Sequence, residues 1–164
     1  MTSPFQGLAL GCGNFGGIGS APEFFGQGID EPTARQIMDA AWAGGVHWFD
    51  TGDAYGGGRS EEFIGRWLGE HDHDVVLTTK VFHSTTGTPG DTGLAPNRIR
   101  RQLEGSLGRL GVDRVDLYLA HEPDASVPLA DTIETFEQLR SEGLIGAWGL
   151  SNYDADGIRE ALAI

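Results

Sequence analysis

Short stretches of bulky apolar residues alternate along the chain with segments whose apolar residues recur at helical spacing. The apolar stretches are bounded by glycine and other turn residues, which predicts buried strands at 8–11, 46–50, 75–80, 115–120 and 145–150. The amphipathic segments predict helices that begin after residue 30, at 60 and at 96, and that span 131–142 and 154–164. The pattern therefore predicts five βα units in succession.

Residues that satisfy or interrupt helical hydrogen bonds mark the predicted helix ends. Asp30 and Ser60 are expected to cap two helices, because their side-chain oxygens can accept hydrogen bonds from free backbone N–H groups. Pro96 is expected to open a third helix, and glycines at 44–45, 111 and 143 are expected to end helices. No linker separates the units, so we expect one domain.

The alternation predicts an α/β fold with a parallel sheet, because strands joined by helical crossovers run in the same direction. Such a sheet is either open and doubly wound or closed as an eight-stranded barrel, and periodicity alone does not choose between them. The barrel form needs about 250 residues. This chain has 164 and would supply five of the eight units, leaving the sheet unclosed.

Composition and charge disfavour nucleic acids, membranes and metal ions as partners of this chain. The chain has 24 acidic and 11 basic residues, and its formal charge of -13 repels nucleic-acid backbones and anionic membranes alike. No apolar run approaches the roughly 18 residues that cross a bilayer. The only cysteine, Cys12, has no disulfide partner and no companion at zinc spacing. We therefore expect a cytoplasmic protein with no nucleic-acid or membrane partner and no metal.

A glycine motif at residues 11–16 matches GxGxxG directly after the first predicted strand. In a Rossmann dinucleotide site, the third glycine opens a helix whose amino end holds the pyrophosphate. Residues 17–28 contain four more glycines and a proline, which disfavour such a helix. We therefore interpret this segment as a flexible loop above the first strand.

Ionisable residues lie at successive strand ends. Asp50 ends the second strand, Tyr55 follows in its loop, Lys80 ends the third strand and His121 follows the fourth. Each alone has a structural explanation as a cap, a packed aromatic, a solvated lysine or a buried histidine. Because the carboxyl ends of parallel strands share one face, the four are expected to converge, and together they favour catalysis.

The chemistry that suits these residues is carbonyl reduction with a nicotinamide cofactor. Tyr55 could give a proton to the developing alkoxide, and the Lys80 ammonium would favour negative charge on the tyrosine oxygen. Asp50 would keep Lys80 charged and fixed, while a neutral His121 could orient the substrate oxygen. A metal-dependent hydrolase or lyase using Asp50 and His121 is the weaker alternative, since no further ligand lies at a strand end.

Four segments, FDTGDAYGGGRSEEFIG, LTTKV, RVDLYLAHEPD and GLSNY, resemble signatures of the aldo-keto reductase family. The resemblance spans nearly the whole chain, and HEPD and GLSNY are most similar to the branch with aflatoxin aldehyde reductases and potassium-channel β subunits. It implies a (β/α)8 barrel and NADPH, or NADH, as cofactor. It also implies Tyr55 as proton donor, Asp50, Lys80 and His121 as its partners, and Ser151 with Asn152 as the residues that bind the nicotinamide carboxamide.

The resemblance also implies that residues 1–164 form a single partial barrel. The remaining strands and the loops that hold the rest of the cofactor would lie beyond Ile164. We expect a fragment, a partly ordered chain, one piece of a nicked barrel, or a natural half-barrel that self-associates through its open sheet edge. The function expected is NAD(P)H-dependent reduction of aldehydes or ketones. A nonenzymatic binding or regulatory protein, or an inactive fragment, is the alternative.

Three further features carry weaker expectations. Phe24 and Phe25, and with less support Trp148, are candidates to line a substrate pocket. The loop at 83–95 is long enough to act as a substrate lid. The run His71-Asp72-His73-Asp74 could ligate a metal, but it precedes the third strand, so we expect a solvated turn on the opposite face.

Overall fold

The computed structural model describes residues 7–70 and 73–164, which form a parallel sheet flanked by helices. The sheet has five strands in the order β1-β2-β3-β4-β5, so each strand pairs with the next in the chain. The strands are β1 (Ala9–Gly11), β2 (Trp48–Asp50), β3 (Val76–Val81), β4 (Val115–Ala120) and β5 (Ile145–Leu150). The helices are α1 (Glu31–Ala43), α2 (Arg59–Glu70), α3 (Pro96–Leu110), α4 (Leu129–Ser141) and α5 (Ala155–Ala163).

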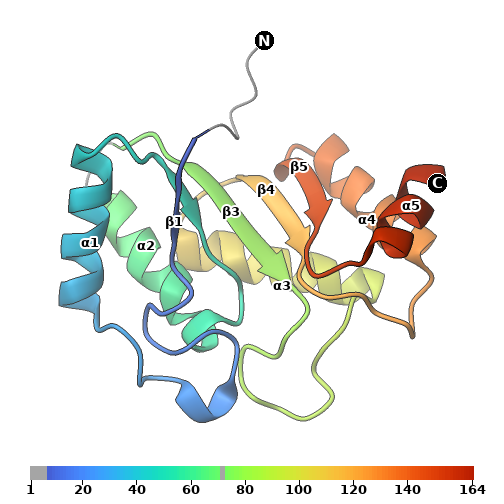
Figure 1. The fold of residues 1–164 in the computed structure, drawn as a ribbon, viewed down its shortest axis with the longest axis horizontal. Coiled ribbons are helices and arrows are strands. Elements are labelled where there is room, and N and C mark those ends of the chain that lie inside the picture. Colours follow the sequence, from blue (N-terminus) through green and yellow to red (C-terminus); the bar gives the residue numbers. More distant parts are fainter. Residues whose placement is uncertain (1–6, 71–72) are drawn as a thin grey trace.

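The strand order distinguishes the two architectures that the sequence left open. A doubly wound sheet reverses its strand order at a switch point, whereas a barrel adds every strand at the same edge. Here the order never reverses, and consecutive helices pack against one another along the sheet (Figure 1). The described residues therefore form five consecutive units of a β/α barrel wall.

Helix boundaries follow most of the predicted signals. The Asp30 carboxylate caps α1 by accepting a hydrogen bond from the Thr33 backbone N–H at 3.0 Å. At the other end, the N–H of Val46 bonds to the Ala41 carbonyl at 2.9 Å, so residue 46 still closes the helix. This explains why β2 begins at Trp48, later than predicted.

The prediction that Ser60 caps α2 was wrong. The helix begins at Arg59, directly after a 3-10 turn at Tyr55–Gly58. The Ser60 hydroxyl is fully buried, bonds to the Thr51 hydroxyl at 2.7 Å and donates to the Cys12 carbonyl at 2.9 Å. Ser60 therefore joins α2 to the loops that follow β1 and β2.

A charged cluster is buried between α2, β3 and α3. Glu61 is fully buried, and its carboxylate accepts hydrogen bonds from the Thr79 hydroxyl at 2.5 Å and from Arg109 Nε at 2.7 Å. Pairing of this kind offsets much of the free-energy cost of burying an ionised carboxylate. Glu61 thus links the strand that carries Lys80 to two helices.

The hydrophobic core fills the space between the sheet and the helices. Its largest fully buried side chains come from both layers and include Phe49, Trp67, Leu103, Tyr118 and Phe136. As predicted, no α-helix follows the glycine motif, where only a 3-10 turn (Pro22–Phe24) precedes α1. Within 7–70 and 73–164, no helix has the length and apolar character required to cross a membrane.

Candidate active site

The predicted ionisable residues meet at the carboxyl ends of the strands. Lys80, on β3, donates hydrogen bonds from Nζ to the Asp50 carboxylate and, at 2.8 Å, to the Thr51 carbonyl. The Lys80 side chain is 7% exposed, while that of Asp50 is 33% exposed. The ammonium is therefore held by two acceptors at the floor of the site.

Tyr55 lies above this floor. The Lys80 Nζ is 4.9 Å from the centroid of the Tyr55 ring, and the Tyr55 Oη is 3.4 Å from His121 Nε2. A Cβ at Gly52 would lie 3.3 Å from the tyrosine ring, so this glycine allows the ring to pack closely on the backbone. The Tyr55 hydroxyl and the His121 imidazole can both form hydrogen bonds to a third polar atom. The arrangement can thus exchange a proton with an oxygen bound between Tyr55 and His121.

His121 is 8% exposed and directly follows β4, where its N–H bonds to the Val81 carbonyl at 3.0 Å. Burial, followed by the positive charge of Lys80 and the nearby His83, lowers the pKa of His121 to about 4. The imidazole is consequently neutral near pH 7. A neutral imidazole can donate a hydrogen bond to a carbonyl oxygen without competing with Tyr55 as the acid.

We expect the His121 imidazole to titrate with a midpoint near pH 4, well below its ordinary value of about 6.5. Between these pH values the unfolded chain binds more protons, so the free energy of unfolding should fall as the pH is lowered from 6.5 to 4. An NMR titration of the imidazole resonances measures the midpoint. His121→Gln should flatten the pH dependence of stability in that window, whereas a midpoint near 6.5 would contradict the assignment.

Ser151 and Asn152 follow β5 and lie beside His121. The Ser151 N–H bonds to the Ala120 carbonyl at 2.8 Å. Asn152 has a positive φ of 59°, and its side-chain amide donates to the His121 carbonyl at 2.8 Å and to Glu122 Oε1 at 3.0 Å. Both predicted cofactor residues therefore lie at the same strand ends as the four ionisable groups.

The loop at 83–95 is anchored to α3 by a buried arginine. Arg98 is 6% exposed, and its guanidinium donates to the carbonyls of His83 at 2.9 Å, Asp91 at 2.9 Å and Gly93 at 3.1 Å. Asp124 accepts a further bond from the Leu94 N–H at 2.7 Å. The predicted lid is thus fixed at both ends.

Three loops interlock at the rim of the site. A Cβ added at Gly57 would lie 2.9 Å from the Phe25 ring and 3.1 Å from the Thr85 carbonyl oxygen. A Cβ at Gly87 would lie 2.9 Å from the Pro22 side chain. The loops after β1, β2 and β3 therefore pack against one another through glycine positions, and we call these three segments the rim loops.

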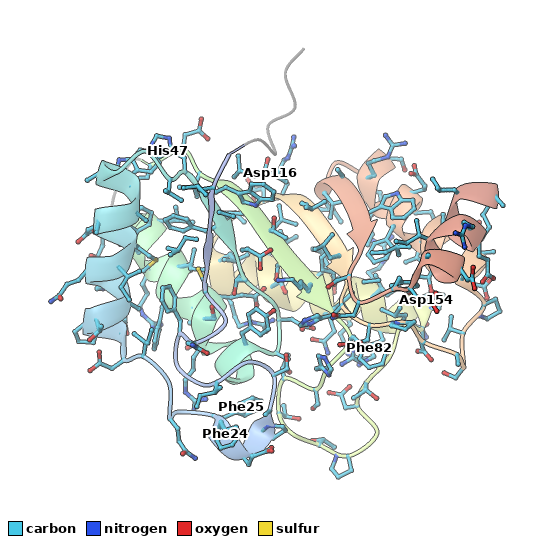
Figure 2. The ribbon with its side chains drawn as sticks, viewed as in Figure 1. Phe24, Phe25, His47, Phe82, Asp116 and Asp154 are labelled. Atoms are coloured by element: carbon cyan, nitrogen blue, oxygen red, sulfur yellow. The ribbon has the colours of Figure 1, made fainter. Side chains whose placement is uncertain are left out.

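The aromatic candidates separate into two groups. Figure 2 shows Phe24 and Phe25 at the same end of the sheet as Phe82, and Phe24 is 40% exposed. Trp148 instead donates from its indole N–H to Glu137 of α4 at 2.6 Å, and its ring stacks on Phe136. Trp148 belongs to the helix side of the sheet, so it does not line the proposed site.

The described residues offer neither a cluster of metal ligands nor a reactive thiol. The predicted metal run includes His71 and Asp72, which lie outside the described ranges. Within 7–70 and 73–164, no group of three or more histidine, cysteine or acidic side chains is placed to hold a metal ion. Burial raises the pKa of the Cys12 thiol, so this cysteine does not supply a reactive thiolate.

Sequence reasoning missed His83 as a residue of this site; it is the first residue of the loop that Arg98 anchors. The His83 ring is edge-on to His121, with ring centroids 4.9 Å apart. Burial is the main cause that lowers the pKa of His83, and the charge of Arg98 adds to it. The sequence feature that could have indicated His83 as a site residue is its position three residues after Lys80.

Comparison with known proteins gives consistent results. The model of the "Aldo/keto reductase family" matches residues 8–163. A probable voltage-gated potassium channel subunit beta of Oryza sativa subsp. japonica is 37% identical over 143 residues, covering 85% of this chain and 43% of that protein. An uncharacterized oxidoreductase, YrpG, of Bacillus subtilis is 39% identical over 140 residues, covering 79% of this chain and 43% of that protein.

Solved structures show the same likeness. The holo form of an aldo-keto reductase from Bacillus halodurans has a TM-score of 0.80 and 34% identity, covering 95% of this chain and 49% of that one. A glycerol dehydrogenase from Gluconobacter oxydans has a TM-score of 0.79 and 30% identity, covering 95% of this chain and 47% of that one. The chain spans about half the length of the relatives it matches.

Proposed function

The chain belongs to the aldo/keto reductase family, and from this premise we propose that the protein is a nicotinamide-dependent oxidoreductase that reduces aldehydes or ketones to alcohols. The observation that carries the proposal is the convergence of a tyrosine hydroxyl, a buried lysine and a neutral histidine at the strand ends. We propose NADPH as the cofactor, with NADH as the alternative.

In this mechanism, Tyr55 gives its proton to the carbonyl oxygen as negative charge develops there. Lys80 stabilises the charge left on the tyrosine, and Asp50 with the Thr51 carbonyl fixes the lysine in place. The neutral His121 orients the same oxygen toward Tyr55. A bound nicotinamide supplies the hydride for the carbonyl carbon.

The residues after β5 fit a nicotinamide carboxamide. An amide has both a donor and an acceptor, and the hydroxyl of Ser151 and the side-chain carbonyl of Asn152 offer the complementary groups. The bond from the Asn152 amide nitrogen to the His121 carbonyl orients that side chain beside the proposed reaction centre. We propose that these two residues hold the carboxamide.

We also propose that the protein acts in the cytoplasm on small carbonyl compounds, without nucleic-acid or membrane partners. The formal charge of -13 supports the absence of nucleic-acid and membrane partners, because negative charge repels polyanions. Among the described residues, β1 and β5 each pair on one side only. Self-association through these open edges stays a prediction.

A regulatory function without catalysis is the second candidate. It is favoured by the names of several relatives, including the potassium channel subunit beta of Oryza sativa. The convergent tyrosine, lysine and histidine favour the enzyme, because a purely regulatory protein has no need of them.

Titration of the purified protein with NADPH and NADH, followed by cofactor fluorescence, tests the proposal. Saturable binding followed by turnover of an aldehyde or ketone is the expected result. Binding without turnover of any carbonyl compound would favour the regulatory candidate. A folded protein that binds neither nucleotide would contradict both the cofactor assignment and the reductase function.

A further inference from the structure

His83 and Glu122 flank His121 at the outer side of the proposed reaction centre. The His83 Nε2 lies 3.9 Å from Glu122 Oε1, and the two side chains are 31% and 36% exposed. Neither takes part in the proton transfer described above. They are therefore polar groups beside the reaction centre that are free to contact the rest of the substrate.

The geometry of the centre directs substrate substituents toward this pair. A carbonyl oxygen that contacts both Tyr55 Oη and His121 Nε2 must lie next to these two atoms, which are 3.4 Å apart. The floor behind them is filled by Lys80, whose side chain is 7% exposed. The carbon chain of the substrate must therefore leave on a side away from Lys80, and His83, whose side chain is 31% exposed, lies edge-on to His121 there.

Both members of the pair are held in position before any substrate arrives. Arg98 donates to the His83 carbonyl at 2.9 Å, which fixes the start of the loop at 83–95. Glu122 accepts the side-chain amide of Asn152 at 3.0 Å. Polar groups that are fixed in this way bind a ligand without a large loss of conformational entropy.

We propose that His83 and Glu122 form a specificity-determining pair that selects carbonyl compounds with a hydroxyl group on the carbon next to the carbonyl. This inference rests on the reductase function proposed above. The substrate hydroxyl donates to the Glu122 carboxylate and accepts from the His83 N–H. Because burial lowers the pKa of His83, its ring is neutral near pH 7 and offers one donor nitrogen and one acceptor nitrogen.

The same pair disfavours two other classes of substituent. A carboxylate next to the carbonyl would meet the negative charge of Glu122, and His83 as a neutral ring does not offset it. An alkyl group would leave both polar side chains without their hydrogen bonds to the substrate, and sites built to bind a hydroxyl reject analogues that lack it. We therefore expect α-hydroxy ketones and aldehydes to be preferred over α-keto acids and over simple alkyl ketones.

The test compares hydroxyacetone, butanone and pyruvate, which place a hydroxyl, a methyl and a carboxylate oxygen at similar positions. The quantity measured is the ratio of kcat/KM for hydroxyacetone to that for butanone, because the active fraction of each preparation cancels in this ratio. His83→Phe keeps an aromatic ring beside His121 but removes both nitrogens. We expect the ratio to fall about ten-fold, the loss of one hydrogen bond to a neutral group.

Two further variants sharpen the result. Glu122→Gln should lower the same ratio and raise kcat/KM for pyruvate relative to butanone, because it removes the negative charge. His47→Phe is the matched control, since His47 stacks on Trp42 at the opposite end of the sheet (Figure 2) and should leave the ratio unchanged.

The outcomes separate the two proposals. If the unaltered protein reduces both ketones and His83→Phe keeps the original ratio, the specificity pair is wrong and the reductase function stands. If the unaltered protein binds NADPH but reduces none of the three compounds nor any other carbonyl, the reductase function fails and the specificity pair with it.

Discussion

Tyr55→Phe is expected to slow carbonyl reduction by about 10²- to 10⁴-fold while leaving NADPH affinity nearly unchanged. A general acid contributes an acceleration of about this size, and phenylalanine removes only the hydroxyl that would give the proton. The ring itself should stay in place, because its contacts with Gly52 and with the Lys80 ammonium do not need the oxygen. The loss should therefore appear in turnover and not in folding.

Steady-state reduction and NADPH fluorescence titration measure the two quantities on the same preparation. Tyr153→Phe is a suitable control for the loss of a tyrosine hydroxyl, because Tyr153 is a half-buried tyrosine that is not one of the four ionisable residues of the proposed reaction centre. Turnover by Tyr55→Phe that matches the control would remove Tyr55 from the mechanism.

Glu61→Ala should lower the free energy of unfolding by about 3–5 kcal/mol, the usual loss when one member of a buried ion pair is removed. The substitution leaves the Arg109 guanidinium, whose side chain is only 23% exposed, without its carboxylate partner. It also leaves the buried Thr79 hydroxyl without an acceptor and opens a cavity between α2 and β3. The effect on stability should be the largest of the single changes considered.

Urea unfolding compares Glu61→Ala with Glu62→Ala. The neighbouring Glu62 forms only an exposed pair with Arg66 at 3.8 Å, so its removal should change stability by less than about 0.5 kcal/mol. Equal effects of the two substitutions would show that the buried pair does not stabilise the fold.

The alternation of strands and helices along the chain and the convergence of the catalytic candidates could be predicted from the sequence because both depend on local patterns, whereas the order of the strands in the sheet came from the structure. Each strand is a short apolar stretch with its own turn signals, and each helix has its own apolar stripe. Once these units alternate, chain topology alone brings Asp50, Lys80 and His121 to one face.

The polar residues at the start of α2 could not be predicted in this way. Ser60 and Glu61 have the composition of an exposed helix start, and the pattern gives no sign that this helix begins against the strands. It does so because Gly56 and Gly57 adopt positive φ angles of 61° and 69°, which turn the chain inward directly after Tyr55. The burial of Ser60 and Glu61 is thus a consequence of tertiary packing.

The burial of Asp53 could not be predicted from its neighbours in the sequence either. It lies between Asp50 and Tyr55 in sequence, where a solvated turn residue would be expected, yet it is fully buried. Neither of its carboxylate oxygens has a hydrogen-bond partner among the described residues. Burial, and then the negative charge of Glu61, raise its pKa well above the ordinary range of an aspartate.

The packing of the rim loops has a consequence for how substrate preference can change over generations. Because Gly57 lies between Phe25 and the Thr85 carbonyl, a side chain added in one loop displaces the two others. Substitutions in contacting segments are generally non-additive. Selection therefore acts on the three loops as one inherited unit, and new substrate preferences should require paired replacements across loops more often than single ones.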